Sequence, residues 1–169
     1  GCEVRHIIVQ PDGKVLIGGH FEFVNGQARP GFARLDVNGT LDTGFNPVLP
    51  TAGGEYGFCA MALQPDGKIL VGGEFYNPEA TLLRFNPDGT PDTSFNYDYD
   101  GSPQGNKPIM AIAVQPDGKI ILGGDFDLVR LNSDGSRDTT FNSPVALVIP
   151  YGMTLQPDGK IVGVVASGL

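Results

Sequence analysis

Hydrophobic residues in this chain occur as short runs that are bounded by turn residues. The clearest runs are 4–9, 15–17, 58–63, 69–71, 109–114 and 120–122. They are rich in β-branched residues, and no segment of useful length has the 3.6-residue spacing of an amphipathic helix, so the pattern predicts strands. Because the runs are nearly continuous rather than alternating, we expect other sheets to cover both faces of these strands.

One five-residue segment, Gln-Pro-Asp-Gly-Lys, stands between paired runs and occurs four times. It begins at Gln10, Gln64, Gln115 and Gln156, at intervals of 54, 51 and 41 residues. Proline presets φ for the first central position of a turn, and glycine can take the left-handed conformation that follows. Each copy is therefore predicted to be the tip of a β-hairpin. Positive φ is expected at Gly13, Gly67, Gly118 and Gly159.

The remainder of each repeat has a constant order. In the first three copies the second run ends in Gly-Gly, a polar residue and Phe, and a loop of variable length follows. Next come an Arg-Leu or Arg-Phe pair, a second tight turn and the sequence Asp-Thr-x-Phe-Asn. We expect the arginine run to be a third strand and the Thr-x-Phe run to be a short fourth strand.

Three or four strands in about 50 residues is the pattern of a propeller blade. The predicted fold is therefore all-β, a β-propeller-type repeat with three full blades and a partial fourth. The repeats span about 4–46, 57–96, 108–142 and 151–169 of a single 1–169 region. A β-solenoid is the structural alternative, although its coils are usually shorter than this period.

The repeat also resembles a known family. The run Ala-Val-Gln-Pro-Asp-Gly-Lys-Ile-Ile-Leu-Gly-Gly-Asp-Phe at 113–126 and the Arg-to-Asn segment at 130–142 are similar to the delta-60 repeat. That family is a bacterial propeller-type repeat common in large secreted or surface-associated proteins. The resemblance implies an extracellular or cell-surface location but no ligand and no catalytic residue. The fourth copy departs from the pattern, because 163–166 reads Gly-Val-Val-Ala where Gly-Gly-x-Phe is expected.

Propellers close with four to eight blades, so three and a part are few. We expect the chain to be a fragment of a larger propeller or array, completed by further chain or by another subunit. A small irregular ring, in which 153–165 docks against the first repeat, is the third alternative. Cys2 and Cys59 are the only cysteines. Whether they form a disulfide is left open, because they stand at different offsets from their turns.

Charge and hydropathy disfavour two interactions, binding to nucleic acid and insertion across a membrane. The formal net charge is −8 and the lysines and arginines form no run, which disfavours binding to nucleic-acid phosphates. No stretch of 18 or more apolar residues occurs, so no membrane-spanning segment is predicted.

The second turn resembles part of an Asp-rich calcium loop, which needs carboxylates at alternating positions, a glycine and a later acid. An arginine stands where the first carboxylate should fall, and it would repel a cation. We instead predict structural ion pairs to the acid eight residues later. These pairs are Arg34 with Asp42, Arg84 with Asp92, and Arg130 with Asp138. Calcium is therefore disfavoured, and no metal site and no cofactor are predicted.

Candidate ligand-binding residues fall outside the scaffold positions. His20, Glu74 and Asp125 occupy one equivalent position in three repeats and could form a polar set, whereas Tyr76, Tyr97 and Tyr99 lie in linkers or loops. No Ser-His-Asp set, phosphate loop or paired-cysteine motif is present, so no catalytic residue is predicted. The expected function is a non-catalytic structural or binding module that contacts a protein or a glycan through variable loops at 22–33 and 76–83 and the Tyr97 segment. The alternative is a propeller-based hydrolase or lyase with its site at a central channel.

Overall fold

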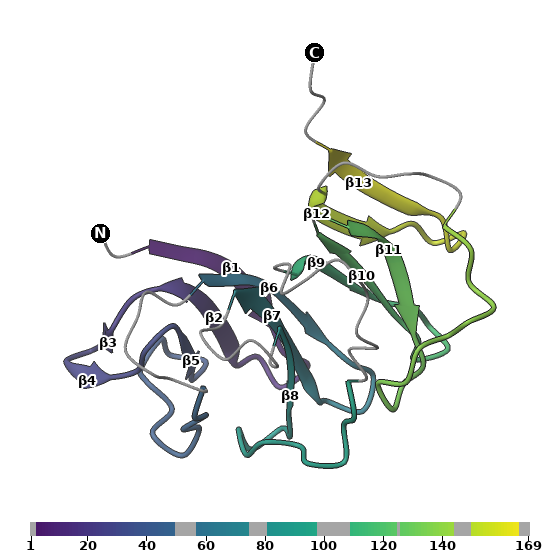
Figure 1. Ribbon diagram of the computed structural model, residues 1–169. Coiled ribbons are helices and arrows are strands. Elements are labelled where there is room, and N and C mark those ends of the chain that lie inside the picture. The colour runs from purple at the N-terminus through teal and green to yellow at the C-terminus, as the bar shows by residue number, and fades with distance from the viewer. Residues whose placement is uncertain are drawn as a thin grey trace.

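The computed structural model describes residues 3–49, 57–74, 81–97, 109–124, 126–143 and 150–165. Regular structure in this part of the chain is all β, and no helix long and apolar enough to cross a membrane occurs in it. Each repeat folds into its own antiparallel sheet (Figure 1). The all-β propeller-type fold that the repeat pattern predicts is therefore confirmed.

Three sheets have three strands each and the fourth has two. The first contains β1 (Glu3–Val9), β2 (Val15–His20) and β5 (Phe32–Leu35), and the second contains β6 (Gly57–Leu63), β7 (Ile69–Glu74) and β8 (Leu82–Phe85). The third contains β9 (Ile109–Val114), β10 (Ile120–Gly124) and β11 (Phe126–Leu131), and the fourth contains β12 (Pro150–Leu155) and β13 (Ile161–Val165). A small hairpin of β3 (Phe23–Val24) and β4 (Gln27–Ala28) is inserted in the first repeat.

The hairpin tips have the conformation that their sequence predicts. All four turn glycines have positive φ, between 81° and 84°. In the first tip the amide of Gly13 donates to the carbonyl of Gln10 at 2.9 Å, and the amide of Gln10 donates to the carbonyl of Lys14 at 2.8 Å. The carboxylate of Asp12 accepts a hydrogen bond from the amide of Lys14 at 3.1 Å. These contacts recur in the other three tips.

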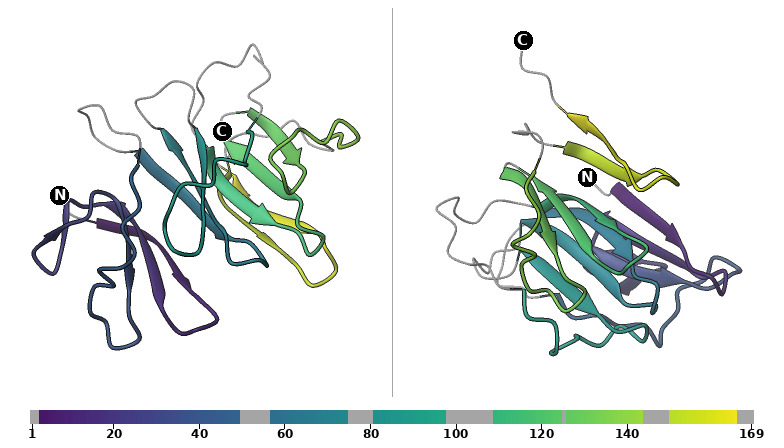
Figure 2. Two further views of the ribbon diagram at one scale, coloured as in Figure 1. Left: turned by 90° about the horizontal axis from the view of Figure 1, so that it is seen from below. Right: turned by 90° about the vertical axis from the view of Figure 1, so that its right-hand side faces the viewer.

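The four sheets stand side by side in chain order along an arc (Figures 1 and 2). The first strands of consecutive sheets contact one another, β1 with β6, β6 with β9 and β9 with β12, so they line the inner side of the arc. Both tight turns of a repeat lie at one edge of its sheet, because β1 leads into the first turn and β5 leads into the second. The segment between β2 and β5 lies at the opposite edge, and β7 and β10 end at that edge of their sheets. We call these the turn edge and the loop edge.

Apolar side chains fill the spaces between consecutive sheets. Between the first and second sheets the buried residues include Leu16, Phe32, Phe45, Ile69 and Phe85. Between the second and third sheets they include Leu70, Leu82, Ile112, Ile120 and Leu122. The expectation that both faces are covered is therefore confirmed for β7 and β10. It fails for β1, where Ile7 and Val9 are exposed on the outward face of the first sheet.

Two details of the predicted blade are wrong. The Thr-x-Phe run is a turn rather than a fourth strand, and only single bridges, such as Leu35 to Leu41, follow the third strand. At the end of the second run the amide of Asn96 donates to the carbonyl of Asp134 in the next repeat at 3.2 Å. The variable loop of the third repeat is also shorter than expected. β11 already starts at Phe126, which pairs with Gly124, so that a single residue separates β10 from β11.

Candidate functional site

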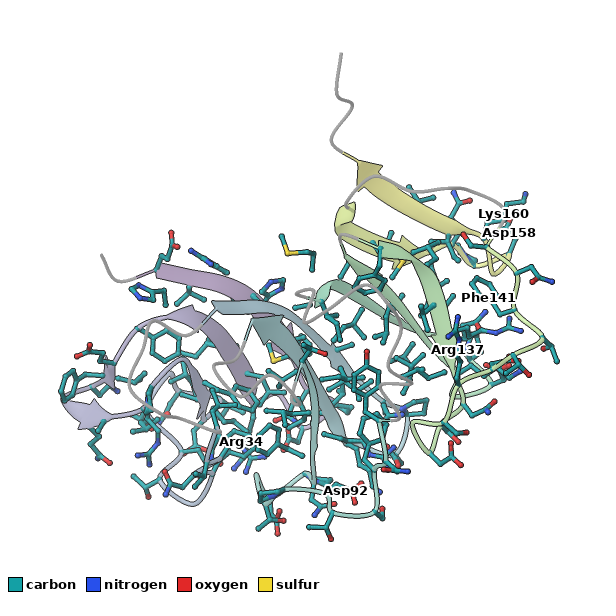
Figure 3. All side chains as sticks on the ribbon, in the orientation of Figure 1. Arg34, Asp92, Arg137, Phe141, Asp158 and Lys160 are labelled. Atoms are coloured by element: carbon teal, nitrogen blue, oxygen red, sulfur yellow. The ribbon has the colours of Figure 1, made fainter. Side chains whose placement is uncertain are left out.

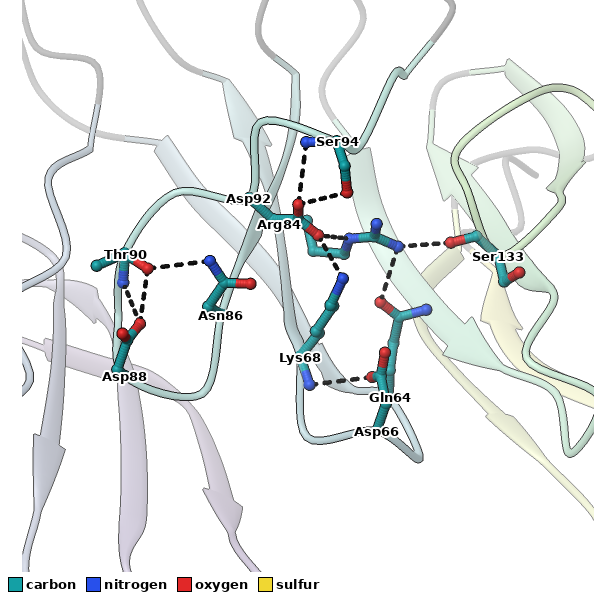
Figure 4. A network of polar contacts seen from close by, with 10 residues as sticks. All are labelled: Gln64, Asp66, Lys68, Arg84, Asn86, Asp88, Thr90, Asp92, Ser94 and Ser133. Atoms are coloured by element: carbon teal, nitrogen blue, oxygen red, sulfur yellow. Dashed lines mark hydrogen bonds and ion pairs between the residues drawn. The ribbon is translucent and has the colours of Figure 1, made fainter.

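The most constant chemical feature is a polar cluster around the aspartate of Asp-Thr-x-Phe. In the second repeat Asp92 Oδ2 lies 2.8 Å from Lys68 Nζ and 2.7 Å from Arg84 Nε (Figure 4). Lys68 comes from the first turn and Arg84 from the third strand β8, so one oxygen joins three parts of the blade. Both Asp92 and Arg84 are more than nine-tenths buried.

The other two complete repeats contain the same cluster. Asp42 Oδ2 accepts from Lys14 Nζ at 2.7 Å and from Arg34 Nε at 2.9 Å. Asp138 Oδ2 accepts from Lys119 Nζ and from Arg130 Nε, each at 2.8 Å. Each of the three ion pairs that the eight-residue spacing predicts is therefore present. The lysine of the first turn is a second partner that the spacing did not reveal.

The second carboxylate oxygen and the ring that follows complete the cluster. Asp92 Oδ1 accepts hydrogen bonds from the amide of Ser94 at 3.0 Å and from its hydroxyl at 2.6 Å. The Arg84 guanidinium carbon lies 4.3 Å from the centre of the Phe95 ring, and the equivalent distances in the other repeats are 4.4 and 4.7 Å. Arginine favours such stacking on an aromatic face. The repeated Lys, Arg, Asp and Phe residues thus form one unit, which we call the blade clasp.

The clasp lowers the pKa of each aspartate. For Asp42 the hydrogen bond from Lys14 is the main cause, and it outweighs burial so that the pKa falls to about 2. For Asp92 burial is the largest single influence and acts to raise the pKa, but the hydrogen bonds from Lys68 and Ser94 together outweigh it, and the pKa is lowered. The hydrogen bond from Lys119 likewise lowers the pKa of Asp138. All three carboxylates are therefore ionised at neutral pH.

The clasp also reaches the next repeat. Arg34 Nη1 donates to the carbonyl of Pro87 at 2.6 Å, and Arg84 Nη1 donates to the carbonyl of Ser133 at 2.5 Å. Pro87 and Ser133 are the second residues of the following repeat's second turn. Each of these two arginines therefore uses Nε for its own aspartate and Nη1 for the neighbouring blade.

The glycine of that second turn lies against the clasp phenylalanine. A Cβ atom at Gly89 would lie 2.9 Å from the Phe45 ring, and one at Gly135 would lie 2.8 Å from the Phe95 ring and from the Asn96 carbonyl oxygen. Only glycine fits at such a distance from a ring held in the core. Consecutive blades are therefore joined at the turn edge by an arginine hydrogen bond and a ring packed on a glycine.

The fourth repeat supplies an internal comparison. Its sequence has the turn lysine, Lys160, but it contains no Asp-Thr-x-Phe. Lys160 Nζ pairs instead with Asp158 of its own turn at 2.8 Å, and both side chains are mostly exposed (Figure 3). The turn lysines that pair with a clasp aspartate have side chains 27–31% exposed, whereas that of Lys160 is 76% exposed.

The clasp aspartates are poorly suited to binding a metal ion. A lysine and an arginine flank each aspartate, and such positive charges repel a calcium ion. No group of three or more His, Cys, Asp or Glu side chains capable of holding a metal occurs among the described residues. The carboxylates of the second turns, Asp88 and Asp134, are each taken up by the amide and hydroxyl of the residue two positions later.

The predicted ligand residues lie partly outside the described part of the chain. His20 is half-buried at the end of β2, opposite Glu3, and Glu74 ends β7 opposite Gly57, so both reach the loop edge. Asp125, Tyr76 and Tyr99 lie outside the described residues, as does Cys2 of the possible disulfide. Tyr97 is half-buried and packs on the apolar cluster between the second and third sheets, so that its ring serves the core at least in part.

One surface feature at the loop edge was not predicted from the sequence. Segment 22–33, expected to be a loop, contains the β3–β4 hairpin, with positive φ at Asn25 (49°) and Gly26 (77°). Asn-Gly between strand-forming residues is the strongest short signal of a two-residue hairpin, and it could have been recognised. Val24 packs against the buried side chains of the first sheet, whereas Phe23 is 60% exposed.

Comparison with known proteins agrees with this architecture. The family described as "Domain of unknown function (DUF5122) beta-propeller" matches residues 10–45, 64–95 and 115–141. The three matches run from the first turn to the clasp phenylalanine of each complete repeat. The match supports a bacterial propeller-type repeat, and the narrower delta-60 resemblance stays a prediction. No curated protein matches the chain in sequence.

Solved structures with the same fold are distant in sequence. An extracellular domain from B. thetaiotaomicron has a TM-score of 0.65 at 16% identity, with 95% of this chain and 20% of that chain covered. Virginiamycin B lyase from Staphylococcus aureus has a TM-score of 0.62 at 18% identity, with 93% and 47% covered. PorZ, a surface component of the type-IX secretion system of Porphyromonas gingivalis, has a TM-score of 0.57 at 16% identity, with 97% and 25% covered. The chain thus spans half or less of each of these proteins, and the likeness shows the fold alone.

The contact between blades predicts a graded response to alanine at the second-turn glycines. Gly39, Gly89 and Gly135 have similar φ values of 83°, 90° and 96°, so an alanine suffers similar backbone strain at each. Only at Gly89 and Gly135 would the new Cβ meet a phenylalanine ring. We expect Gly39→Ala to cost about 1 kcal/mol and the other two to cost about 1–3 kcal/mol more. Urea denaturation of the three variants measures this, and equal losses would contradict the packing.

The lowered carboxylate pKa values predict loss of stability in acid. The ordinary aspartate pKa is 3.8 and that of Asp42 in the folded protein is about 2. A group whose pKa is lowered by folding stabilises the protein above the unfolded pKa, and this stabilisation is lost as pH falls through the folded value. The melting temperature should therefore be flat from about pH 7 to 5 and fall from about pH 4 towards 2. Asp92→Asn should make that fall shallower, and an unchanged slope would argue against the clasp as its source.

The same charges predict that calcium has no effect. At neutral pH the melting temperature should be unchanged by EDTA and by added calcium chloride, because a lysine and an arginine already neutralise each clasp carboxylate. A ligand that binds only the folded state raises the melting temperature by mass action. A fall of several degrees in EDTA, reversed by calcium, would show that a metal site exists after all.

Proposed function

The chain belongs to the DUF5122 β-propeller family, and on this premise we propose that it is a non-catalytic structural and binding module of a secreted or surface-associated protein. It contacts a protein partner or a glycan through the loop edge of its blades. One observation carries this proposal. The repeated charged residues are used within the scaffold, whereas variation between repeats is concentrated at the loop edge.

The loop-edge segments differ in length on a constant frame. Eleven residues separate β2 from β5, seven separate β7 from β8, and one separates β10 from β11. Variable segments on a rigid scaffold are where binding specificity usually resides. The β3–β4 hairpin fits this role, since it carries the exposed Phe23 ring with the polar residues Asn25 and Gln27 near it in sequence. An aromatic ring with amide neighbours can stack on a sugar or pack into a protein surface.

The cellular setting is supported at the level of fold. The similar structures include an extracellular domain and a bacterial surface component. The delta-60 resemblance of the repeat points to the same setting. The strongly negative charge also fits a module that does not bind nucleic acid.

The enzymatic alternative has less support. One similar structure is a lyase, but its identity with this chain is too low to transfer an activity. Catalysis on a propeller would require acids or histidines that converge near the inner strands. Among the described residues, the carboxylates with lowered pKa values are in the clasps or in exposed turns, where lysine, arginine or hydroxyl groups already engage them.

Binding measurements on matched variants test the proposal. The purified chain is applied to a glycan array, and binding to a positive glycan is then compared for wild type, Phe23→Ala and Val48→Ala. Both side chains are largely exposed, and Val48 lies outside the loop edge segments. Phe23→Ala should weaken binding at least tenfold without a change in melting temperature, because the stacking ring is lost, and Val48→Ala should have no effect.

Other outcomes separate the alternatives. Glycan binding that is insensitive to Phe23→Ala would move the contact away from the β3–β4 hairpin. Absence of any glycan ligand would leave a protein partner, to be sought by crosslinking from a photoreactive group placed at position 25. Turnover of a bound glycan by the purified chain would overturn the non-catalytic assignment.

A further inference from the structure

The contact between consecutive blades has a donor side and an acceptor side. The donor side is the clasp arginine and phenylalanine of one repeat. The acceptor side is the backbone of the second turn in the following repeat, where a carbonyl receives the arginine and a glycine receives the ring. The structure contains this contact twice, from Arg34 and Phe45 to Pro87 and Gly89, and from Arg84 and Phe95 to Ser133 and Gly135.

The first repeat has an acceptor turn that no described residue occupies. Its second turn, 36–39, ends in Gly39 with the same positive φ as Gly89 and Gly135. Gly89 and Gly135 are buried, whereas Gly39 is exposed and no atom lies within 4 Å of the position that a Cβ would take there. Val37 corresponds to Pro87 and Ser133, so its carbonyl is the counterpart of the two carbonyls that receive an arginine.

The apolar face beside this turn is open as well. Ile7 is 65% exposed, whereas its counterparts Met61 and Ile112, each three residues before the turn glutamine, are 8% exposed. Val9 is also exposed, at 67%. In the second repeat the corresponding face is covered by Leu16, Phe32 and Phe45 of the first.

In the first repeat this face is covered over β2 and β5 but not over β1. Ile7 pairs with Ile17, and Ile17 pairs with Ala33, so all three side chains lie on the outward face. Ile17 and Ala33 are buried in a cluster against which Val24 of the β3–β4 hairpin packs. Ile7 and Val9 on β1 and Val37 in the second turn remain exposed.

We propose that Ile7, Val9, Val37 and Gly39 form a docking surface for a further repeat of the same kind, which precedes the first repeat in the assembled propeller. That repeat would donate an arginine from its third strand to the carbonyl of Val37 and would pack an Asp-Thr-x-Phe ring on Gly39. The surface is continuous with the two established contacts and requires the same chemistry. The inference rests on the scaffold part of the proposed function and not on any ligand.

A second copy of this chain fits the surface less well. To reach it, a copy would have to present the clasp of its third repeat, Arg130 and Phe141. The sheet of that repeat is already covered, because β12 packs on β9 and β10. A docked second copy would have to displace this hairpin, whereas a preceding repeat would not.

The test adds one repeat to the complete chain. Residues 57–108 are duplicated ahead of Gly1, so that the added copies of Arg84 and Phe95 can reach Val37 and Gly39. The extended chain should unfold in one transition with a melting temperature several degrees higher than that of the 169-residue chain. Ile7→Lys should leave the melting temperature of the 169-residue chain unchanged, because the side chain is solvated there, and should lower that of the extended chain by several degrees, by about 2–4 °C for each 1 kcal/mol lost.

A matched control isolates the donor chemistry. Arg84→Leu with Phe95→Ala in the added copy alone should return the extended chain to the melting temperature of the 169-residue chain. If Ile7→Lys has the same small effect in both chains while circular dichroism shows that the added repeat is folded, the proposal is wrong. These measurements involve no ligand. The docking proposal can therefore be wrong while the proposed glycan or protein binding is right, and the proposed binding can be wrong while the docking proposal is right.

Measurements on the 169-residue chain decide the matter if the added repeat does not fold. An apolar dye should bind the wild-type chain and should bind less to a variant with Ile7→Lys and Val9→Lys, with light scattering showing a monomer in both. A dimer that Ile7→Lys dissociates would assign the surface to a second copy and overturn the proposal. A monomer that binds no dye and is destabilised by Ile7→Lys would show that the chain covers this face itself.

Discussion

The ion pair between the clasp aspartate and the third-strand arginine is the constraint on which the rest of the structure depends. Asp92 holds Arg84 and Lys68 at one oxygen and the amide of Ser94 at the other. The blade therefore closes at the point where a fourth strand would otherwise be needed. Without the carboxylate, two positive charges would lie close together in a largely buried site, which is far less favourable than a satisfied pair. The same pair aims the free end of the guanidinium at the next blade.

Much of the blade could be predicted because its determinants lie within one repeat. The turn glycines have the positive φ that Pro-Asp-Gly requires, and the eight-residue spacing between Arg34 and Asp42 places the two at bonding distance. The lysine and phenylalanine of the clasp also recur in every complete repeat. Their recurrence indicated that they have a structural role. Spacing alone could not show that Lys14, 28 residues before Asp42, contacts the same Asp42 oxygen as Arg34 does.

The features that escaped prediction depend on contacts between repeats or on the length of a single insertion. The Thr-x-Phe run is β-prone in isolation, yet its phenylalanine packs on a glycine of the next turn rather than in a strand. The candidate site was predicted less well than the fold for a related reason. A scaffold position recurs and can be recognised, whereas a binding position such as Phe23 occurs once, and its exposure follows from the way Val24 anchors the hairpin to the first sheet.

The two edges of the blades have separate roles that follow from strand direction. Antiparallel strands bring both tight turns to one edge, where the clasps and the contacts between blades lie, and bring the variable segments to the other. Residues at the loop edge can therefore be substituted without disturbing the clasps. The contact between blades is also directional, because an arginine and a ring on one blade meet a carbonyl and a glycine on the next. Such a head-to-tail contact repeats until a rotation closes it into a ring, so assembly is determined at the turn edge and recognition is left to the loop edge.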